Sequence, residues 1–314
     1  MNALLVVSPS PHIKSPRTTT SIMRDVLIAL SPAAIATTIL FGIRALVMLI
    51  VSNVVCGLLE FFFCKITKKK NTVTDLSAFV TGTLLALSLP ATFGEPKNLW
   101  MLILGDIVAI VIVKCLFGGI GFNFANPAIT ARIVLLVCFT DTAAATVNTN
   151  FSADGVSGAT PLADFAAGKT ELLPSLFDMF VGNRSGAVGE VCTVALIAGG
   201  IYLIVRRVIS WHTPVSYIAT VGLLSLILGK QPLFQMMAGG LVIGAFFMAT
   251  DYTTSPDTPS GKLIFGTGCG LITVLIRFYG SYPEGVSFAI LLMNILNPYI
   301  IKLTRRKAFG GVRV

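Results

Sequence analysis

Long apolar runs, separated by short polar or turn-rich breaks, dominate the chain. A hydrocarbon core about 30 Å thick needs about 20 mostly apolar residues per spanning helix. The runs lack the alternation that marks barrel strands, so helices are expected. The pattern predicts an all-α polytopic membrane protein with about ten spans, at residues 25–41, 45–64, 76–89, 99–117, 124–139, 187–209, 214–229, 231–250, 262–278 and 285–302.

Composition agrees with this pattern. Hydrophobic residues make up 54% of the chain and charged residues only 12%, whereas soluble domains carry about a quarter charged residues. Mean hydropathy is +0.85. Residues 1–24 lack the layout of a cleaved signal peptide, which predicts a retained cytoplasmic N-terminal segment, matched by a cytoplasmic tail at 304–314.

The positions of Lys and Arg predict the orientation. Cytoplasmic loops carry an excess of these residues, and most of the 23 fall on one side if the N-terminus is inside. Both termini are then cytoplasmic, and the longest loop, 140–186, faces outward. The net charge of +9 is therefore interpreted as an orientation signal and not as a nucleic-acid footprint.

The outward loop divides the predicted spans into five and five. An odd number of spans in each half gives the halves opposite topology, which is the arrangement of inverted-repeat transporters. We expect one five-helix repeat at 25–139 and a second at 187–303. A weak internal similarity supports the repeat: Thr81–Ala86 in the third span resembles Ile243–Met248 in the eighth.

Three of the ionisable residues within predicted spans are singled out, because charge at depth in a membrane is costly and indicates function. Asp106 and Lys114 are eight residues apart on one helical face, and Glu60 lies near the inner end of the second span. They are candidates for an ion pathway. The alternative is an internal ion pair, or snorkelling of Lys114 and Glu60 to the interface.

Other segments of the sequence limit the kinds of cofactor and catalytic site that can be expected. The glycine-rich stretch 118–127 predicts either a re-entrant turn lining a cavity or a short inner loop. The six cysteines show no Cys-x-x-Cys spacing and the two histidines are far apart, so neither an iron–sulfur site nor a zinc site is indicated. Walker, Rossmann and nucleophile-elbow motifs are absent from the sequence.

The outward loop contains a candidate modification site. Thr160 offers a hydroxyl next to two small residues, Gly158 and Ala159, and is preceded by Ser157 and Asp154. Small neighbours give an enzyme access to the hydroxyl. The alternative is that Thr160 caps a short helix beginning at Pro161 or Leu162.

This Asp-x-x-Ser-Gly-Ala-Thr sequence is similar to the acceptor motif of exported flavin transferases, which attach FMN to the final Thr through a phosphoester. Nearly the whole chain resembles the D subunits of Rnf complexes, the ion-translocating ferredoxin:NAD oxidoreductases. More distantly it resembles the B subunits of sodium-pumping NADH:quinone reductases. The shared landmarks are segments 8–12, 118–127, 154–160, 248–256, 282–289 and 297–298.

The resemblance implies a membrane electron-transfer subunit with covalent FMN on Thr160, in a complex that moves Na⁺ or H⁺. The implied partners are the other Rnf complex subunits, above all the outward-facing G subunit, which is a flavoprotein, and a flavin transferase for maturation. A second, unattached flavin such as riboflavin is also implied. The alternative is a channel or secondary permease for a small solute, without a redox cofactor.

Overall fold

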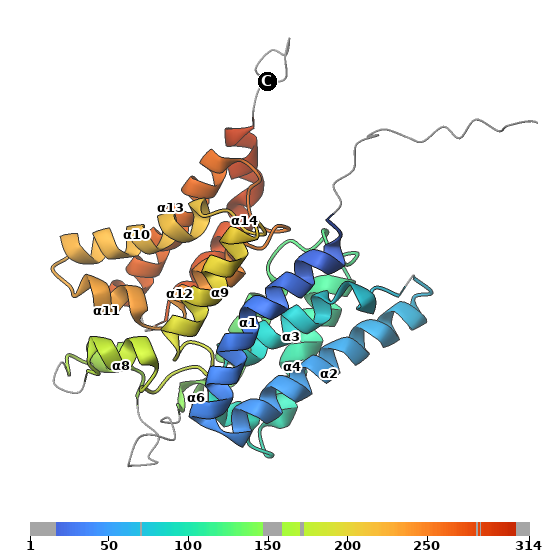
Figure 1. The fold of residues 1–314 in the computed structure, drawn as a ribbon, viewed down its shortest axis with the longest axis horizontal. Coiled ribbons are helices and arrows are strands. Elements are labelled where there is room, and N and C mark those ends of the chain that lie inside the picture. The colour runs from blue at the N-terminus through green and yellow to red at the C-terminus, as the bar shows by residue number, and fades with distance from the viewer. Residues whose placement is uncertain are drawn as a thin grey trace, which may run out of the picture.

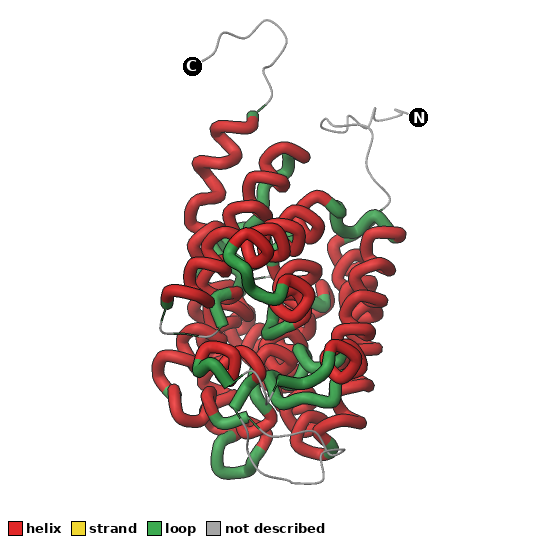
Figure 2. Tube along the Cα trace, turned by 90° about the vertical axis from the view of Figure 1, so that its left-hand side faces the viewer, coloured by secondary structure: helices red, strands yellow, loops and turns green. Residues whose placement is uncertain are grey.

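The computed structural model describes residues 17–69, 71–146, 159–169, 173–280, 282 and 284–305, and Figures 1 and 2 show that this part is built from helices. An isolated antiparallel bridge joins Pro90 to Ala187. Asp154, Ser157 and Gly158 of the predicted acceptor motif lie outside the described residues.

The first half of the chain occupies the right-hand side of Figure 1. Its helices are α1 (Thr19–Phe41), α2 (Ile43–Ile66), α3 (Ser77–Ser88), α4 (Leu99–Ile107), α5 (Pro127–Cys138) and α6 (Thr140–Ala144). Two 3₁₀ turns, η1 (Val73–Asp75) and η2 (Ala91–Gly94), flank α3, and α4 continues as a π-helix, η3 (Val108–Cys115).

The second half begins with two short helices, α7 (Pro161–Ala166) and α8 (Leu176–Val181). It continues through α9 (Thr193–Val205), α10 (His212–Ile227), α11 (Pro232–Met237), α12 (Leu241–Ile243), the π-helix η5 (Gly244–Met248), α13 (Pro259–Tyr279) and α14 (Val286–Thr304). The start of α1 and the end of α14 lie at one end of the bundle, and α6 and α8 lie at the other (Figure 1).

Hydropathy and length confirm a polytopic membrane protein. Of the helices in the described part of the chain, four are long and apolar enough to cross a bilayer, namely α1, α2, α13 and α14, and α3, α5, α9 and α10 are shorter apolar helices. Large apolar side chains such as Ile43, Leu226 and Leu303 are exposed on the outside of the bundle. A soluble protein does not expose apolar surface on this scale.

Two predicted spans differ from the structure. The range 231–250 is not one helix, because the chain breaks at Ala238–Gly240, where Gly239 adopts a left-handed φ of 62° that side chains other than glycine rarely take. The range 187–209 becomes helical only at Thr193, and the residues before it form a turn. The other predicted ranges coincide with helices to within a few residues.

Small residues allow close approach between helices. A Cβ added to Gly82 of α3 would meet the backbone carbonyl of Ser52 on α2, and one added to Gly199 of α9 would meet that of Ala29 on α1. Such contacts are typical of helix packing inside membranes. The α1–α9 contact joins the two halves, and α5 and α14 make a second contact between them.

Candidate functional site

Thr160 immediately precedes α7. Its backbone is extended (φ −68°, ψ 150°), and its Oγ1 accepts a hydrogen bond from the amide of Ala163 at 3.2 Å. Pro161 follows at the first helical position, which is the expected start of a helix. The capping geometry considered for Thr160 is therefore present, and it leaves the hydroxyl at the helix end.

Helix α7 is held against the second half by apolar contacts. Leu162 is buried in a small cluster with Met179 and Phe234, and the ring of Phe165 stacks on that of Phe234 with centroids 5.5 Å apart. Ser185 donates a hydrogen bond to the carbonyl of Ala159 at 2.7 Å. These contacts fix Thr160 relative to the bundle.

Thr160 lines a cavity of about 440 Å³, which we call the Thr160 cavity. Ligand pockets usually fall in the range of roughly 300–1,000 Å³. Its walls come from the end of α3, from α5 and α6, from α7 and from the residues before α14, and they are largely apolar. The walls include Leu136, Ala143 and Tyr282, together with the charged side chains of Arg132 and Glu284.

A group of charged residues, the ionic cluster, lies behind this cavity and consists of Arg132, Arg184, Glu190, Arg277 and Glu284. The guanidinium of Arg132 contacts the carboxylates of Glu190 at 2.8 Å and Glu284 at 2.5 Å. Except for Glu284, which is 19% exposed, these side chains are buried. Arg132 lies inside the predicted span 124–139 and was not among the candidate residues, although an intramembrane arginine is itself a signal of function.

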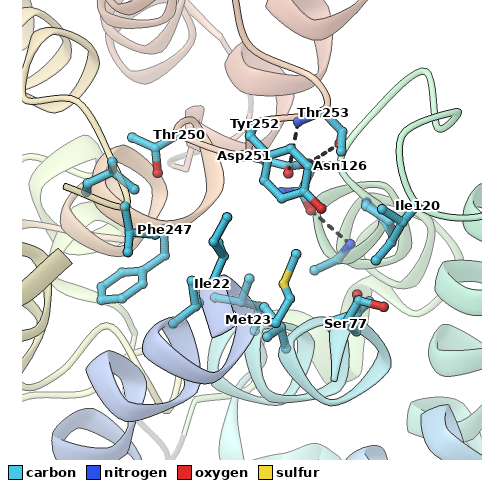
Figure 3. Close-up of a pocket in the computed structure, with 18 of the residues that line it drawn as sticks. Ile22, Met23, Ser77, Ile120, Asn126, Phe247, Thr250, Asp251, Tyr252 and Thr253 are labelled. Carbon is cyan, nitrogen blue, oxygen red and sulfur yellow. Dashed lines mark hydrogen bonds between the residues drawn. The ribbon is translucent and has the colours of Figure 1, made fainter. Parts of the chain in front are cut away.

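A second cavity, of about 100 Å³, lies among α1, α3, the 118–127 stretch and η5, and is drawn in Figure 3. On one side of it, Asn126 donates to the carbonyl of Met248 at 3.3 Å and Asn123 donates to Thr253 at 3.0 Å. The stretch 118–127 is therefore not only a loop between helices. It packs against the second half and lines a cavity, as the re-entrant interpretation expected.

The structure separates the three candidate ion-pathway residues into two sites. Lys114 does not pair with Asp106; its Nζ lies 2.9 Å from a carboxylate oxygen of Glu60 and donates to Ser77 at 2.6 Å. The side chains of Lys114 and Glu60 are only 3% and 1% exposed, so they form an internal ion pair and do not snorkel. Thr72 supplies a further donor to Glu60 at 2.6 Å.

Asp106 occupies a different environment between α2, α3 and α4. Its Oδ1 accepts hydrogen bonds from Ser52 at 2.6 Å and from the thiol of Cys56 at 3.2 Å. Its Oδ2 is buried and has no hydrogen-bond partner among the residues that the structure describes. An unpartnered carboxylate oxygen in an apolar interior is costly, which makes Asp106 unlike the paired charges around it.

The fold and these sites define a class: a polytopic helical membrane protein with buried charged groups and a cavity at one end. Comparison with known families then identifies the chain. It belongs to the NQR2, RnfD, RnfE family, which it matches over residues 6–310.

Curated relatives are similar over nearly the whole chain. The D subunit of the Na⁺-translocating ferredoxin:NAD⁺ oxidoreductase complex of Acetobacterium woodii is 43% identical, over 100% of this chain and 98% of the relative. The D subunit of the proton-translocating ferredoxin:NAD⁺ oxidoreductase complex of Clostridium ljungdahlii is 41% identical over 99% and 97%. The D subunit of the ion-translocating oxidoreductase complex of Escherichia coli is 33% identical over 97% and 98%. The resemblance to D subunits is thereby confirmed.

Proposed function

We propose that this chain is the D subunit of an ion-translocating ferredoxin:NAD oxidoreductase complex in a bacterial or archaeal cell membrane. In this role it transfers electrons through FMN attached to Thr160 by a phosphoester, and it completes no reaction alone. Similarity to D subunits along the full length of the chain supports the assignment to the complex.

One observation carries the flavin proposal: Thr160 lines a cavity of suitable size and polarity. A volume of about 440 Å³ with apolar walls suits a flat aromatic ring, and a charged side chain at its edge suits the polar rim of that ring. Leu136, Ala143 and Tyr282 would contact the ring system and Arg132 its polar edge. When bound, FMN supplies one- and two-electron redox chemistry, which the protein positions and tunes.

Covalent attachment also suits the local structure. Thr160 sits at the end of a helix that Leu162 and Phe165 anchor, so a group attached there stays near the cavity, and tethering replaces diffusive loss by a high effective concentration. Asp154, Ser157, Gly158 and Ala159 would be recognised by the transferase. The resemblance further implies a second, unattached flavin such as riboflavin, to which we assign no residues.

We propose that the ten predicted spans form two inverted five-helix repeats, at 25–139 and 187–303. The pairing of equivalent helices across the halves supports this: α1 contacts α9 and α5 contacts α14. The half-length α3 and the broken α12–η5 segment occupy equivalent third positions. Discontinuous helices of this kind are typical of inverted-repeat transporters. The loop 140–186 would then face the G subunit and the flavin transferase outside the membrane.

Ion coupling is proposed for the buried carboxylates. Asp106, with its unpartnered oxygen, is the favoured residue. The Glu60–Lys114 pair is a second candidate, because separation of a buried pair would expose a carboxylate. The transported ion would be Na⁺ or H⁺.

The first experiment is to express the chain with a flavin transferase and to look for flavin fluorescence on a denaturing gel, mapping the labelled peptide by mass spectrometry. Thr160→Val should abolish the label completely, because it removes the only atom of this side chain that can form the phosphoester. The change also removes a helix cap, which costs about 1 kcal/mol, so membrane insertion should persist.

Ser175→Ala is the matched control. Ser175 caps α8 in the same way, accepting from the amide of Asp178 at 3.1 Å, so this variant loses a comparable cap and should keep the full label. Retained fluorescence in Thr160→Val, or an unlabelled wild-type chain with a transferase that labels another acceptor, would contradict the flavin assignment.

A further inference from the structure

The ionic cluster beside Thr160 is assembled from four separate segments. Arg132 comes from α5, Arg184 and Glu190 from the turn before α9, Arg277 from α13, and Glu284 from the residues before α14. The break between α11 and α12 makes room for them. A Cβ on Gly239 would lie 3.3 Å from a guanidinium nitrogen of Arg277, and one on Gly240 would lie 3.2 Å from a guanidinium nitrogen of Arg132.

The charges in this cluster do not balance. It holds three guanidinium groups and two carboxylates, and both carboxylates contact Arg132. Arg184 donates instead to the backbone carbonyl of Glu190 at 2.6 Å, and Arg277 donates to the carbonyls of Gln235 and Ala238 at 2.7 and 2.8 Å. The Nε of Arg277 is buried and has no hydrogen-bond partner in the described part of the chain. Carbonyl dipoles satisfy hydrogen bonds but do not cancel a full charge, and a buried unbalanced charge is costly.

Four members of the ionic cluster lie next to Thr160. Arg132 and Glu284 line the Thr160 cavity together with Thr160 itself. Arg184, Glu190 and Glu284 also border a small pocket that contains Thr160 and Pro161. A negative group attached to Thr160 would therefore lie against the cluster, in a largely apolar setting where electrostatic interactions are strong.

We propose that the ionic cluster supplies the counter-charge for the Thr160-linked flavin, with Arg132 and Glu284 as positioning residues that set its reduction potential. This inference rests on the proposed function. The phosphoester brings one negative charge, and each electron delivered by a neighbouring redox subunit makes the ring one unit more negative unless a proton follows. Net positive charge in the cluster stabilises the phosphoester charge and the negative charge of the reduced ring. The Glu284 carboxylate at the cavity wall destabilises both of these charges.

The test is a redox titration of the flavin absorbance in the full chain carrying the label. Glu284→Gln removes a negative charge from the cavity wall and should raise the reduction potential. We expect the equilibrium constant for reduction of the flavin to change on the order of tenfold, which is typical when a unit charge is altered beside a buried ionisable group. A tenfold change corresponds to about 59 mV for a one-electron step. Arg132→Gln should move the potential in the opposite direction, and Arg132→Lys, which keeps the charge, should move it less.

The matched control is Glu95→Gln. Glu95 pairs with Arg44 and Lys97 and lies outside the cluster, so this variant loses the same charge and should leave the potential unchanged. If Arg132→Gln does not fold, Glu190→Gln replaces it and should raise the potential as Glu284→Gln does. Equal potentials in wild type and Glu284→Gln, or a shift in the negative direction, would overturn the inference while leaving the flavin on Thr160. A chain without label would instead contradict the proposed function.

Discussion

Among the buried carboxylates that the structure describes, Asp106 is distinguished by its lack of a countercharge. Glu60 has Lys114 and Glu190 has Arg132. Within the described ranges, Asp106 has only the hydroxyl of Ser52 and the thiol of Cys56. A carboxyl group in such a site is stable when a proton or a cation neutralises it. The residue is therefore suited to gain and lose a small positive ion.

From this we predict that Asp106→Asn uncouples ion movement from electron flow. The amide keeps the shape of the side chain but holds no charge, so the ions moved per electron should fall several-fold while electron flux persists. The measurement is ion uptake by vesicles containing the whole complex, at matched electron flux. Asp257→Asn, an exposed aspartate, should have no effect. An unchanged ion-to-electron ratio in Asp106→Asn would remove Asp106 from the pathway.

The sequence singled out Glu60, Asp106 and Lys114 as buried ionisable residues but not their partners, and it gave no role to the members of the ionic cluster. Helical spacing placed Asp106 and Lys114 on one face, yet it carries no information about which neighbouring helix that face meets. Lys114 reaches Glu60 on α2 and Ser77 on α3. Arg132 is 58 residues from Glu190 and 152 residues from Glu284 along the chain, so only the fold brings them together.

At the level of helices, the contact between α2 and α3 depends on Gly82. A Cβ there would lie 2.9 Å from the carbonyl oxygen of Ser52, which is backbone and cannot move aside easily. The same residue provides the carbonyl that accepts a hydrogen bond from Ser52 Oγ at 3.0 Å. Helix separation here would also disturb the environment of Asp106.

We therefore expect Gly82→Ala to lower the free energy of unfolding of the detergent-solubilised protein by about 1–3 kcal/mol, the range typical of overpacking. Gly57→Ala on α2 is the matched control, because its Cβ would meet only the ring of Phe79, at 3.3 Å, and an aromatic side chain can shift. A thermal unfolding series measures both variants. Equal stability of the two would show that the α2–α3 contact adapts freely.

Element prediction succeeded where apolar runs were continuous and failed where glycines interrupted them. The ranges that became α1, α2, α13 and α14 were recognisable from hydropathy alone. The run 231–250 is equally apolar, but Gly239 and Gly240 sit where the ionic cluster needs space, so packing overrides the hydrophobic pattern. The π-helical turns η3 and η5 have no signal in periodicity.

For the molecule as a whole, the distribution of Lys and Arg predicts that both termini are cytoplasmic. In a background without the six native cysteines, Lys169→Cys should react with a membrane-impermeant maleimide added to intact cells, because it follows α7 and is exposed. Ser260→Cys, at the opposite side by this topology and also exposed, should react only after the membrane is opened. The reverse pattern would invert the topology and exclude an exported transferase.

The class of protein could be predicted from composition and the family from local motifs, because neither requires knowledge of tertiary contacts. The Thr160 cavity was not, because its walls come from the ends of α3 and α5 and from residues before α14. Thr160 itself was predictable only through its immediate neighbours. What surrounds it is a property of the assembled halves.

The C-terminal end of α3, in the first half of the chain, depends on hydrogen-bond donors from the second half, and this affects biosynthesis. The carbonyls of Leu87 and Leu89, left free where the helix stops, accept hydrogen bonds from the amides of Gly189 and Val188 at 2.6 and 2.9 Å. A helix end without partners is unfavourable in a bilayer. While the ribosome is still making the first half, those donors do not yet exist. Until the second half is translated, the carbonyls at the end of α3 must therefore be hydrogen-bonded by water or by the insertion machinery.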